Sequence, residues 1–157
     1  MIQRLKKNNS YLILGIILVL IDQITKFLFN NINFTNQYFG LVSGKNYGSA
    51  FSLFSNIPYY SQIIAIISII LIVILYLNKK HFEVNIYSKL SLITFISGII
   101  GNFIDRILFG YVRDFLFIKD FSIFNFADIY LSVGVILLIY SEFVEHQKKS
   151  KKNTKKK

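Results

Sequence analysis

Four long apolar runs constrain the fold of this chain more than any other feature of its sequence. A bilayer core is about 30 Å thick, and a helix needs about 20 predominantly apolar residues to cross it. The 157 residues are 54% hydrophobic, which is too apolar for a soluble domain of this size. We therefore predict an all-α polytopic membrane protein whose four transmembrane helices lie at roughly 11–29, 59–77, 90–108 and 126–144.

The first run starts like a secretory signal peptide, with basic residues ahead of an apolar stretch. It continues, however, through Asp22 and Lys26 to Phe29 without a small-residue cleavage pattern, and three similar runs follow. We therefore expect it to be retained as a spanning helix. The chain is expected to form a single membrane-embedded domain over residues 1–147, followed by a basic, disordered tail at 148–157.

Basic residues gather on one side of the predicted topology. The N-terminus holds three of them, the loop between the second and third runs holds three, and the C-terminal tail holds seven. The loops on the other side hold Lys45, Arg113 and Lys119. Positively charged loops stay in the cytoplasm, so both termini are expected there. Orientation and contact with anionic lipid headgroups then explain the formal net charge of +10, and no nucleic-acid partner is expected.

The outer loop at 30–58 is long and rich in aromatic residues, unlike a free linker. Its pattern around Gly40 and Gly44 is compatible with short strands. We therefore expect a small extracytoplasmic β-sheet or an interfacial element between the first two helices, lying on the outer leaflet.

Polar residues inside and beside the apolar runs meet at one depth of this topology. A polar group without a partner is costly in hydrocarbon, so such residues usually pair with one another or take part in chemistry. The first and third helices run outward and the fourth runs inward, which brings these groups to the outer side of the membrane. They are Asp22, Lys26, Asn46, Asn102, Asp105, Arg106, Asp114, Asn125 and Asp128, with Gly48 close to Asn46 in the first outer loop.

Helical spacing sharpens this picture. Gly98, Asn102 and Asp105 fall at positions i, i+4 and i+7, on one face of the third helix. The glycine would let another backbone approach closely. Asn125 is placed to cap the fourth helix, with Asp128 in its first turn, where the helix dipole favours an ionised carboxylate.

The residue types missing from this cluster narrow its chemistry. The chain has no cysteine, and both histidines, His81 and His146, lie on the cytoplasmic side of the predicted topology. This excludes a thiolate nucleophile, a Ser-His-Asp triad and a His-ligated metal site there. Two carboxyl groups that share a site of low dielectric hold one proton between them. Asp114 and Asp128 lie at the membrane–water boundary, so the sequence favours an aspartic hydrolase with this catalytic pair.

Other interpretations stay open at this stage. The pairs Asp22–Lys26 and Asp105–Arg106 are expected to be structural ion pairs that support the site. Asn125 is as good a helix cap as a catalytic helper. A small proton-coupled membrane transporter would use the same carboxylates as a relay, although the second run carries no charged residue to extend that relay across the membrane. A non-catalytic assembly subunit would use the glycines and the polar face for helix packing.

Five blocks of this sequence, in order, resemble those of a known family. On a chain with four predicted helices, the set resembles signal peptidase II, the lipoprotein signal peptidase, which is a family of membrane aspartic proteases. The sequence departs from the family at Ser97, where a glycine is usual, and at Ile129 and Tyr130, where small or aliphatic residues are common. The five blocks are Asp22-Gln-Ile-Thr-Lys26, Asn46-Tyr-Gly48-Ser-Ala50-Phe51, Gly98-Ile-Ile-Gly101-Asn102-Phe-Ile-Asp105-Arg106, Val112-Arg-Asp114-Phe115 and Phe124-Asn125-Phe-Ala127-Asp128.

The resemblance implies a site and a substrate. Asp114 and Asp128 would be the catalytic pair, and the substrate would be a prolipoprotein whose cysteine carries a diacylglyceryl group, cleaved on the amino side of that cysteine. Asp22 and Lys26 would brace the site, and the outer loop would cradle the substrate. No metal or organic cofactor is implied. The residues that would order the site or contact the substrate are Asn46, Gly48, Asn102, Asp105, Arg106 and Asn125.

The resemblance also implies a place in the cell. The protein would lie in the cytoplasmic membrane of a bacterium, in contact with membrane lipids, with its active site on the extracytoplasmic face. We expect it to act as a monomer.

Overall fold

The computed structural model describes residues 2–48, 53–54, 56–57, 59–78, 82 and 85–154. Within these residues, three helices contain a segment that is long and apolar enough to cross a membrane, namely Ser10–Phe29, Ile86–Phe109 and Phe126–Lys151, and one further helix is apolar but shorter. The helices coincide with the four predicted runs. They are α1 (Ile2–Phe29), α2 (Tyr60–Leu77), α3 (Ile86–Phe109) and α4 (Phe126–Thr154).

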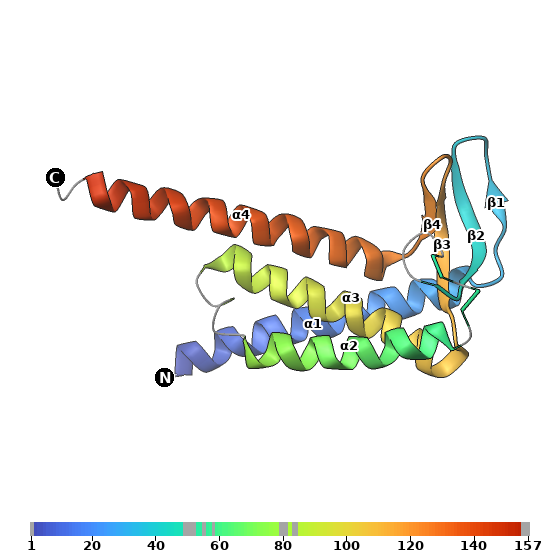
Figure 1. Cartoon of the computed structure of the whole chain (residues 1–157), viewed down its shortest axis with the longest axis horizontal. Coiled ribbons are helices and arrows are strands. Elements are labelled where there is room, and N and C mark those ends of the chain that lie inside the picture. The colour runs from blue at the N-terminus through green and yellow to red at the C-terminus, as the bar shows by residue number, and fades with distance from the viewer. Residues whose placement is uncertain are drawn as a thin grey trace.

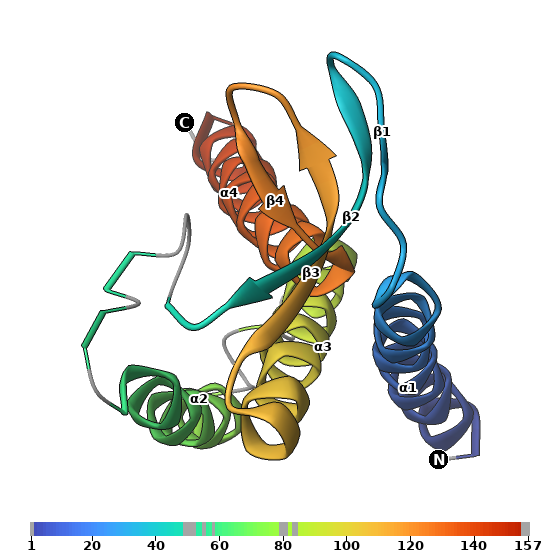
Figure 2. The same ribbon diagram turned by 90° about the vertical axis from the view of Figure 1, so that its right-hand side faces the viewer.

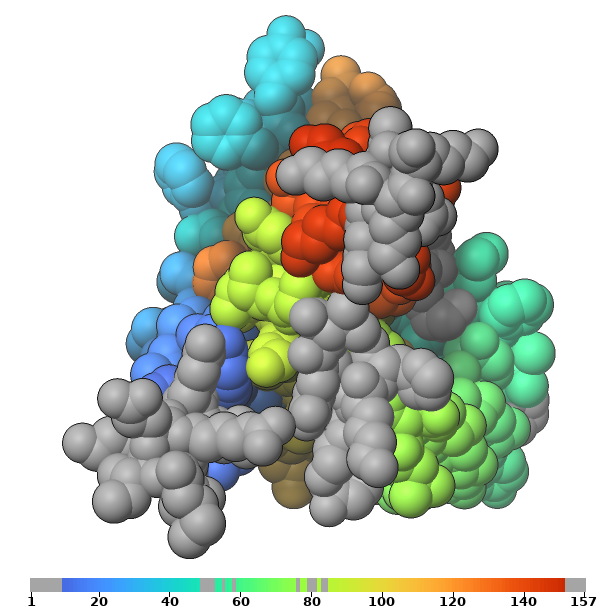
Figure 3. All heavy atoms as spheres, turned by 90° about the vertical axis from the view of Figure 1, so that its left-hand side faces the viewer, coloured from blue at the N-terminus to red at the C-terminus, as the bar shows by residue number. Residues whose placement is uncertain are grey.

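Helix α3 is the centre of the molecule. It packs against α4, α1 and α2, and a small sheet stands at one end of the helices while both chain termini lie at the other (Figure 1). Figure 3 looks at the end that carries the termini and shows α1 and α2 on opposite sides of the start of α3, with α4 above them. Residues from four helices therefore reach the sheet end together.

The sheet has four antiparallel strands in the order β1-β2-β3-β4. Two of them, β1 (Phe34–Thr35) and β2 (Phe39–Asn46), come from the predicted outer loop, as expected. The other two, β3 (Val112–Ile118) and β4 (Ser122–Phe124), come from the segment between α3 and α4, which the sequence analysis treated as a plain loop. Figure 2 shows this sheet standing over the helix ends, with β2 and β3 crossing its middle. Because β2 and β3 are far apart in sequence, neither segment alone reveals their pairing.

The interior of the described residues is polar and their surface is apolar. Among the side chains that the structure describes, those of Ala65, Ile99, Val112, Phe115 and Ala127 are the only buried apolar ones. In the same part of the chain 14 polar or charged residues are buried, and large apolar side chains along α1, α2 and α4 are exposed. This arrangement suits a lipid environment, in which polar groups find partners only inside the protein. Ser97 donates from its hydroxyl to the Gly15 main-chain oxygen at 3.2 Å and so joins α3 to α1.

Two glycines of α3 allow the closest helix contacts. A Cβ on Gly98 would lie 2.6 Å from the Ala127 main-chain oxygen, and one on Gly101 would lie 2.5 Å from the Asp22 carboxylate. Both distances are too short for any side chain, so these positions bring α4 and α1 against α3, as the glycine spacing predicts for Gly98.

Helix α4 is longer than expected. It continues to Thr154, past the predicted end at 144 and through residues 148–154 of the tail that we expected to be disordered. No glycine or proline follows Gly134 to end the helix, and lysine and glutamine are good helix formers. A salt bridge of 3.2 Å joins Glu145 and Lys148 on this extension, which projects beyond the other helices (Figure 1).

Candidate active site

Strand β3 carries Asp114 into the interior at the sheet end of the helices. Its neighbours Val112 and Phe115 are each 2% exposed and fix the strand against the bundle. The Phe115 ring packs between Phe29 of α1 and Phe126 of α4, with ring centroids 5.1 and 5.6 Å away. Asp114 itself is 5% exposed, so its carboxyl group lies in a nearly dry environment.

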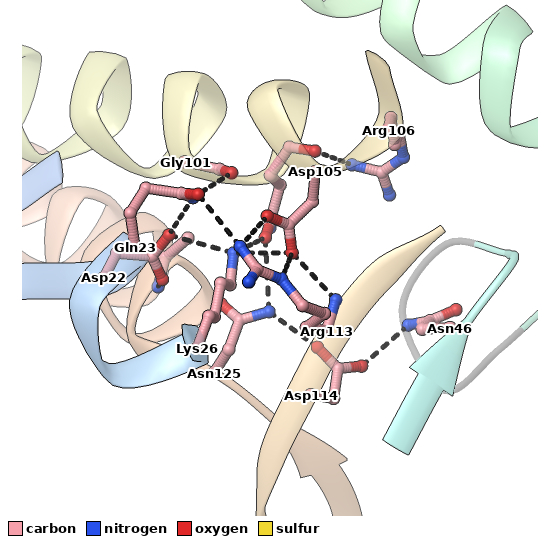
Figure 4. Close-up of polar contacts among 12 residues, drawn as sticks. Asp22, Gln23, Lys26, Asn46, Gly101, Asp105, Arg106, Arg113, Asp114 and Asn125 are labelled. Carbon is pink, nitrogen blue, oxygen red and sulfur yellow. Dashed lines mark hydrogen bonds and ion pairs between the residues drawn. The ribbon is translucent and has the colours of Figure 1, made fainter. Parts of the chain in front are cut away.

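Two asparagines bind the Asp114 carboxyl group. Asn46 Nδ2 donates to one oxygen at 3.1 Å and Asn125 Nδ2 donates to the other at 2.6 Å (Figure 4). Burial, reinforced by the negative charge of nearby Asp128, raises the pKa of Asp114 to about 7, even though the two donors act in the opposite direction. Asp114 therefore holds a proton for much of the time at neutral pH.

Asp128 lies in the first turn of α4, where Asn125 caps the helix as predicted. Asn125 Oδ1 accepts from the Asp128 main-chain nitrogen at 3.1 Å, and Asp128 Oδ2 accepts from the Asn125 main-chain nitrogen at 3.1 Å. This reciprocal arrangement is a capping box. The second Asp128 oxygen accepts from Asn102 Nδ2 at 2.9 Å. Asp128 is thus held by donors on both of its carboxyl oxygens.

Asn125 and Asn102 join the two acids into one site. The Nδ2 group of Asn125 donates to both Asp114 and the Asn102 side-chain oxygen, the latter at 3.2 Å. Asp114 from β3 and Asp128 from α4 thus share Asn125 as a donor, and Asn102, which binds Asp128, accepts from that same asparagine. The predicted topology requires these residues, which are far apart in the sequence, to lie together, and the structure brings them together.

A buried ionic network supports this site from the side of α1. Lys26 Nζ lies 2.9 Å from Asp22 Oδ2, which confirms the predicted pair, and 3.6 Å from Asp105 Oδ2. The predicted pair Asp105–Arg106 is wrong, because Asp105 instead binds Arg113 at 2.8 Å. Consecutive helical residues do not face each other, whereas β3 turns back over α3 and brings Arg113 to Asp105.

Two members of this network were missed by the sequence analysis. The first is Arg113, whose main-chain nitrogen, Nε and Nη2 donate to Asp105. The second is Gln23, which donates to the Gly101 main-chain oxygen at 2.9 Å and to Asp22 at 3.1 Å, and accepts from Arg113 at 3.0 Å. Both residues stand inside motif blocks, yet only the fold reveals their partners.

Arg106 connects α3 with the first outer loop. Its guanidinium donates to the Gly48 main-chain oxygen at 3.3 Å and to the Asn102 main-chain oxygen at 3.4 Å. Asn46 Oδ1 accepts from the Gly48 main-chain nitrogen at 2.9 Å, so this loop is also tied to the residue that binds Asp114. The remaining part of the second sequence block, Ser49-Ala50-Phe51, lies outside the described residues, as does His81.

Two cavities border the site. One of about 280 Å³ opens beside Asp114 on the sheet, and one of about 340 Å³ lies between α2 and α3 beside Arg106, whose buried Nε has no hydrogen-bond partner among the described residues. The first is lined by Gly44, Lys45, Asn46, Asp114, Phe121, Ser122 and Ile123. The second is lined mainly by apolar residues, with Gln62, Ala65, Ile66, Ile69, Phe103, Ile107 and Gly110 beside Arg106.

Comparisons with known proteins agree with this geometry. The family model described as signal peptidase (SPase) II matches residues 14–144. Lipoprotein signal peptidases of Staphylococcus aureus strains Newman and N315 are 32% identical to this chain over 158 residues, covering 94% of it and 96% of each relative. A bacterial membrane enzyme solved by the in meso method at 2.3 Å superposes with a TM-score of 0.76 and 27% identity, over 90% of this chain and 92% of that one. A second such enzyme, solved at 1.9 Å, gives a TM-score of 0.69 and 28% identity over 85% and 92%. Family model, relatives and fold all agree, and the chain belongs to the signal peptidase II family.

Proposed function

We propose that this chain is an aspartic endopeptidase that cleaves diacylglyceryl-modified prolipoproteins on the amino side of the modified cysteine, with Asp114 and Asp128 as its catalytic pair. Removal of signal peptides from prolipoproteins follows from its family. The pair itself is supported by one observation above all, which is that Asn125 donates to both carboxyl groups, to Asp114 from its side chain and to Asp128 from its main chain.

The two acids have different starting states. Asp114 holds the shared proton, because burial and the neighbouring charge raise its pKa to about 7. Asp128 takes the part of the base, since its oxygens accept from Asn102 and from the Asn125 main chain at the start of α4. Such a division of roles is what general acid–base hydrolysis needs at neutral pH.

Peptide cleavage then follows from these positions. Asp128 accepts a proton from a water molecule while the oxygen of that water attacks the scissile carbonyl carbon. Asp114 gives its proton to the carbonyl oxygen. The tetrahedral intermediate collapses when the carbonyl is restored, returning a proton to Asp114. The carbon–nitrogen bond breaks as the amine of the modified cysteine takes the proton that Asp128 holds. Arg106 lies between the site and the first outer loop, where it can bind a main-chain oxygen of the substrate.

The proposal includes the arrangement of the protein in the membrane. All four helices, α2 included, span the bilayer, because 18 helical residues reach about 27 Å. Both termini are cytoplasmic, which the excess of lysine and arginine there supports, and the sheet end carries the active site on the extracytoplasmic face. Residues 1–147 act as one domain and one chain is sufficient, since both acids come from the same polypeptide. The apolar outer surfaces of α1, α2 and α4 face membrane lipids.

The alternative of a proton-coupled transporter is not supported. The relatives are peptidases, and the buried charged residues gather toward the sheet end of the helices. A relay across the membrane would require such residues along the whole length of the bundle.

Cleavage by the purified full-length chain tests the proposal. The substrate is a synthetic peptide with a diacylglyceryl cysteine and a fluorophore–quencher pair across the scissile bond, and mass spectrometry identifies the new N-terminus. Asp114→Asn and Asp128→Asn should each reduce the rate by at least about 10³-fold, while Asp120→Asn, an exposed position of the same hairpin, should keep it. The same peptide without the lipid should be a poor substrate. Cleavage that persists in either active-site variant would refute the catalytic pair.

A further inference from the structure

The buried ionic network is balanced, and this balance has a consequence for the active site. It holds two carboxylates, Asp22 and Asp105, and two cations, Lys26 and Arg113, all less than a tenth exposed. A buried charge without an opposite partner is very costly, so each acid requires a cation. Arg113 supplies that cation to Asp105 through three donors, at 2.8, 3.2 and 2.8 Å, which occupy both carboxylate oxygens.

Because Arg113 holds Asp105 through short hydrogen bonds, the close partners of Lys26 are other groups. Its ammonium lies 2.9 Å from Asp22 and donates to the Asn102 side-chain oxygen at 3.0 Å, whereas its ion pair with Asp105 is longer, at 3.6 Å. Figure 4 shows Lys26 and Arg113 together in this group, beside Asp105.

The bond from Lys26 sets the orientation of the Asn102 amide. An ammonium group has donors only, so it requires the amide oxygen to face it. The Asn102 oxygen also accepts from Asn125, which leaves the Asn102 nitrogen to face Asp128, to which it donates at 2.9 Å. A reversed amide would place donors against Lys26 and Asn125 and would offer an acceptor to a carboxylate.

We propose that Arg113 is a positioning residue for the active site: by binding Asp105 it leaves the Lys26 ammonium to Asn102, and so keeps the Asn102 amide donating to Asp128. This inference rests on the proposed catalytic pair and adds to it a residue that contacts neither acid through its side chain. Without the Arg113 guanidinium, Asp105 keeps Lys26 as its ion-pair partner, now at 3.6 Å, and draws that ammonium toward itself and away from Asn102. The cavity beside Asp114 does not include Arg113, so substrate binding should be little affected.

The test compares two variants of the full-length enzyme in the lipopeptide cleavage assay. Arg113→Gln should lower kcat by roughly tenfold to 100-fold, as misplacement of a catalytic group does, with KM within about threefold of the parent. The double variant Asp105→Asn, Arg113→Gln removes the acid together with its cation, so Lys26 returns to Asn102 and kcat should recover to within about threefold. Lys119→Gln, which removes an exposed cation from the same hairpin, should leave both constants unchanged.

A purely structural role for the Asp105–Arg113 pair gives a different result. Arg113→Gln would then lower thermal stability and the amount of folded protein, because it removes one cation from a buried carboxylate, while kcat per folded molecule would equal that of the parent. The proposal is overturned if kcat per folded molecule of Arg113→Gln stays within about threefold of the parent, or if the double variant does not rise above Arg113→Gln. If Arg113→Gln does not accumulate as folded protein, the double variant is compared directly with the parent. A tenfold loss of kcat in the double variant then overturns the proposal. The proposed function is tested separately in the same assay, by cleavage with the parent and by the inactivity of Asp114→Asn. It can therefore hold even if the role of Arg113 is refuted.

Discussion

Replacing Asp114 by asparagine should make the protein more stable at high pH while it abolishes catalysis. The folded-state pKa of about 7 lies above the ordinary value of 3.8, so ionisation of Asp114 opposes folding. Stability of the parent is therefore fully present below about pH 4, falls as the pH rises, and is constant again above about pH 7. The difference of about three pKa units corresponds to about 4 kcal/mol.

The structure also sets a cost for this substitution. Two donors, Asn46 Nδ2 and Asn125 Nδ2, face the two carboxyl oxygens of Asp114, so the new amide nitrogen opposes one of them. A lost hydrogen bond of this kind costs about 1 kcal/mol. We therefore expect a net gain of about 3 kcal/mol at pH 8 and almost none at pH 5.

Reversible unfolding in mixed micelles, followed by circular dichroism between pH 5 and pH 8, measures this difference. Asp120→Asn serves as the control, because it removes the same charge from an exposed position of the same hairpin and should change stability by less than about 0.5 kcal/mol at every pH. A gain for Asp114→Asn that is equal at pH 5 and pH 8, or absent at both, would show that burial of the ionised carboxylate is not the cause.

Three further predictions concern the same site. The kcat/KM for lipopeptide cleavage should fall about tenfold per unit above pH 7, because Asp114 must hold its proton; a flat profile to pH 9 would contradict this. Gly101→Ala should destabilise the protein by about 1–3 kcal/mol in the same unfolding titration, because the new Cβ would lie 2.5 Å from the Asp22 carboxylate. Gly15→Ala is the control and should be neutral, since its Cβ would make only ordinary contacts, from 3.5 Å outward. Asn125→Ala should cost about 2–4 kcal/mol, because it removes a helix cap and a donor to buried Asp114; a thermal midpoint equal to that of the parent would refute this estimate.

The sequence was sufficient for the features that depend on local pattern. Apolar runs of membrane length predict helices, because hydrocarbon forces backbone groups to pair within the same segment. The capping of α4 by Asn125 and the pair Asp22–Lys26 follow from spacings of three and four residues, which a helix places side by side. That polar residues of α1, α3 and α4 meet at one end of the helices follows from the alternating direction of those helices.

The features that depend on distant contacts were decided by the tertiary structure alone. Strand β3 pairs with β2, and this pairing turns a predicted loop into the strand that carries Asp114 and brings Arg113 onto Asp105 in place of Arg106. Position in the sequence cannot reveal these partners, because a buried ion pair is set by which side chains share a low-dielectric space and not by their separation along the chain. The sequence by itself determined the helices and the set of polar residues at their ends; packing around α3 and the sheet decided which carboxyl group lies beside which donor and which cation each buried carboxylate binds.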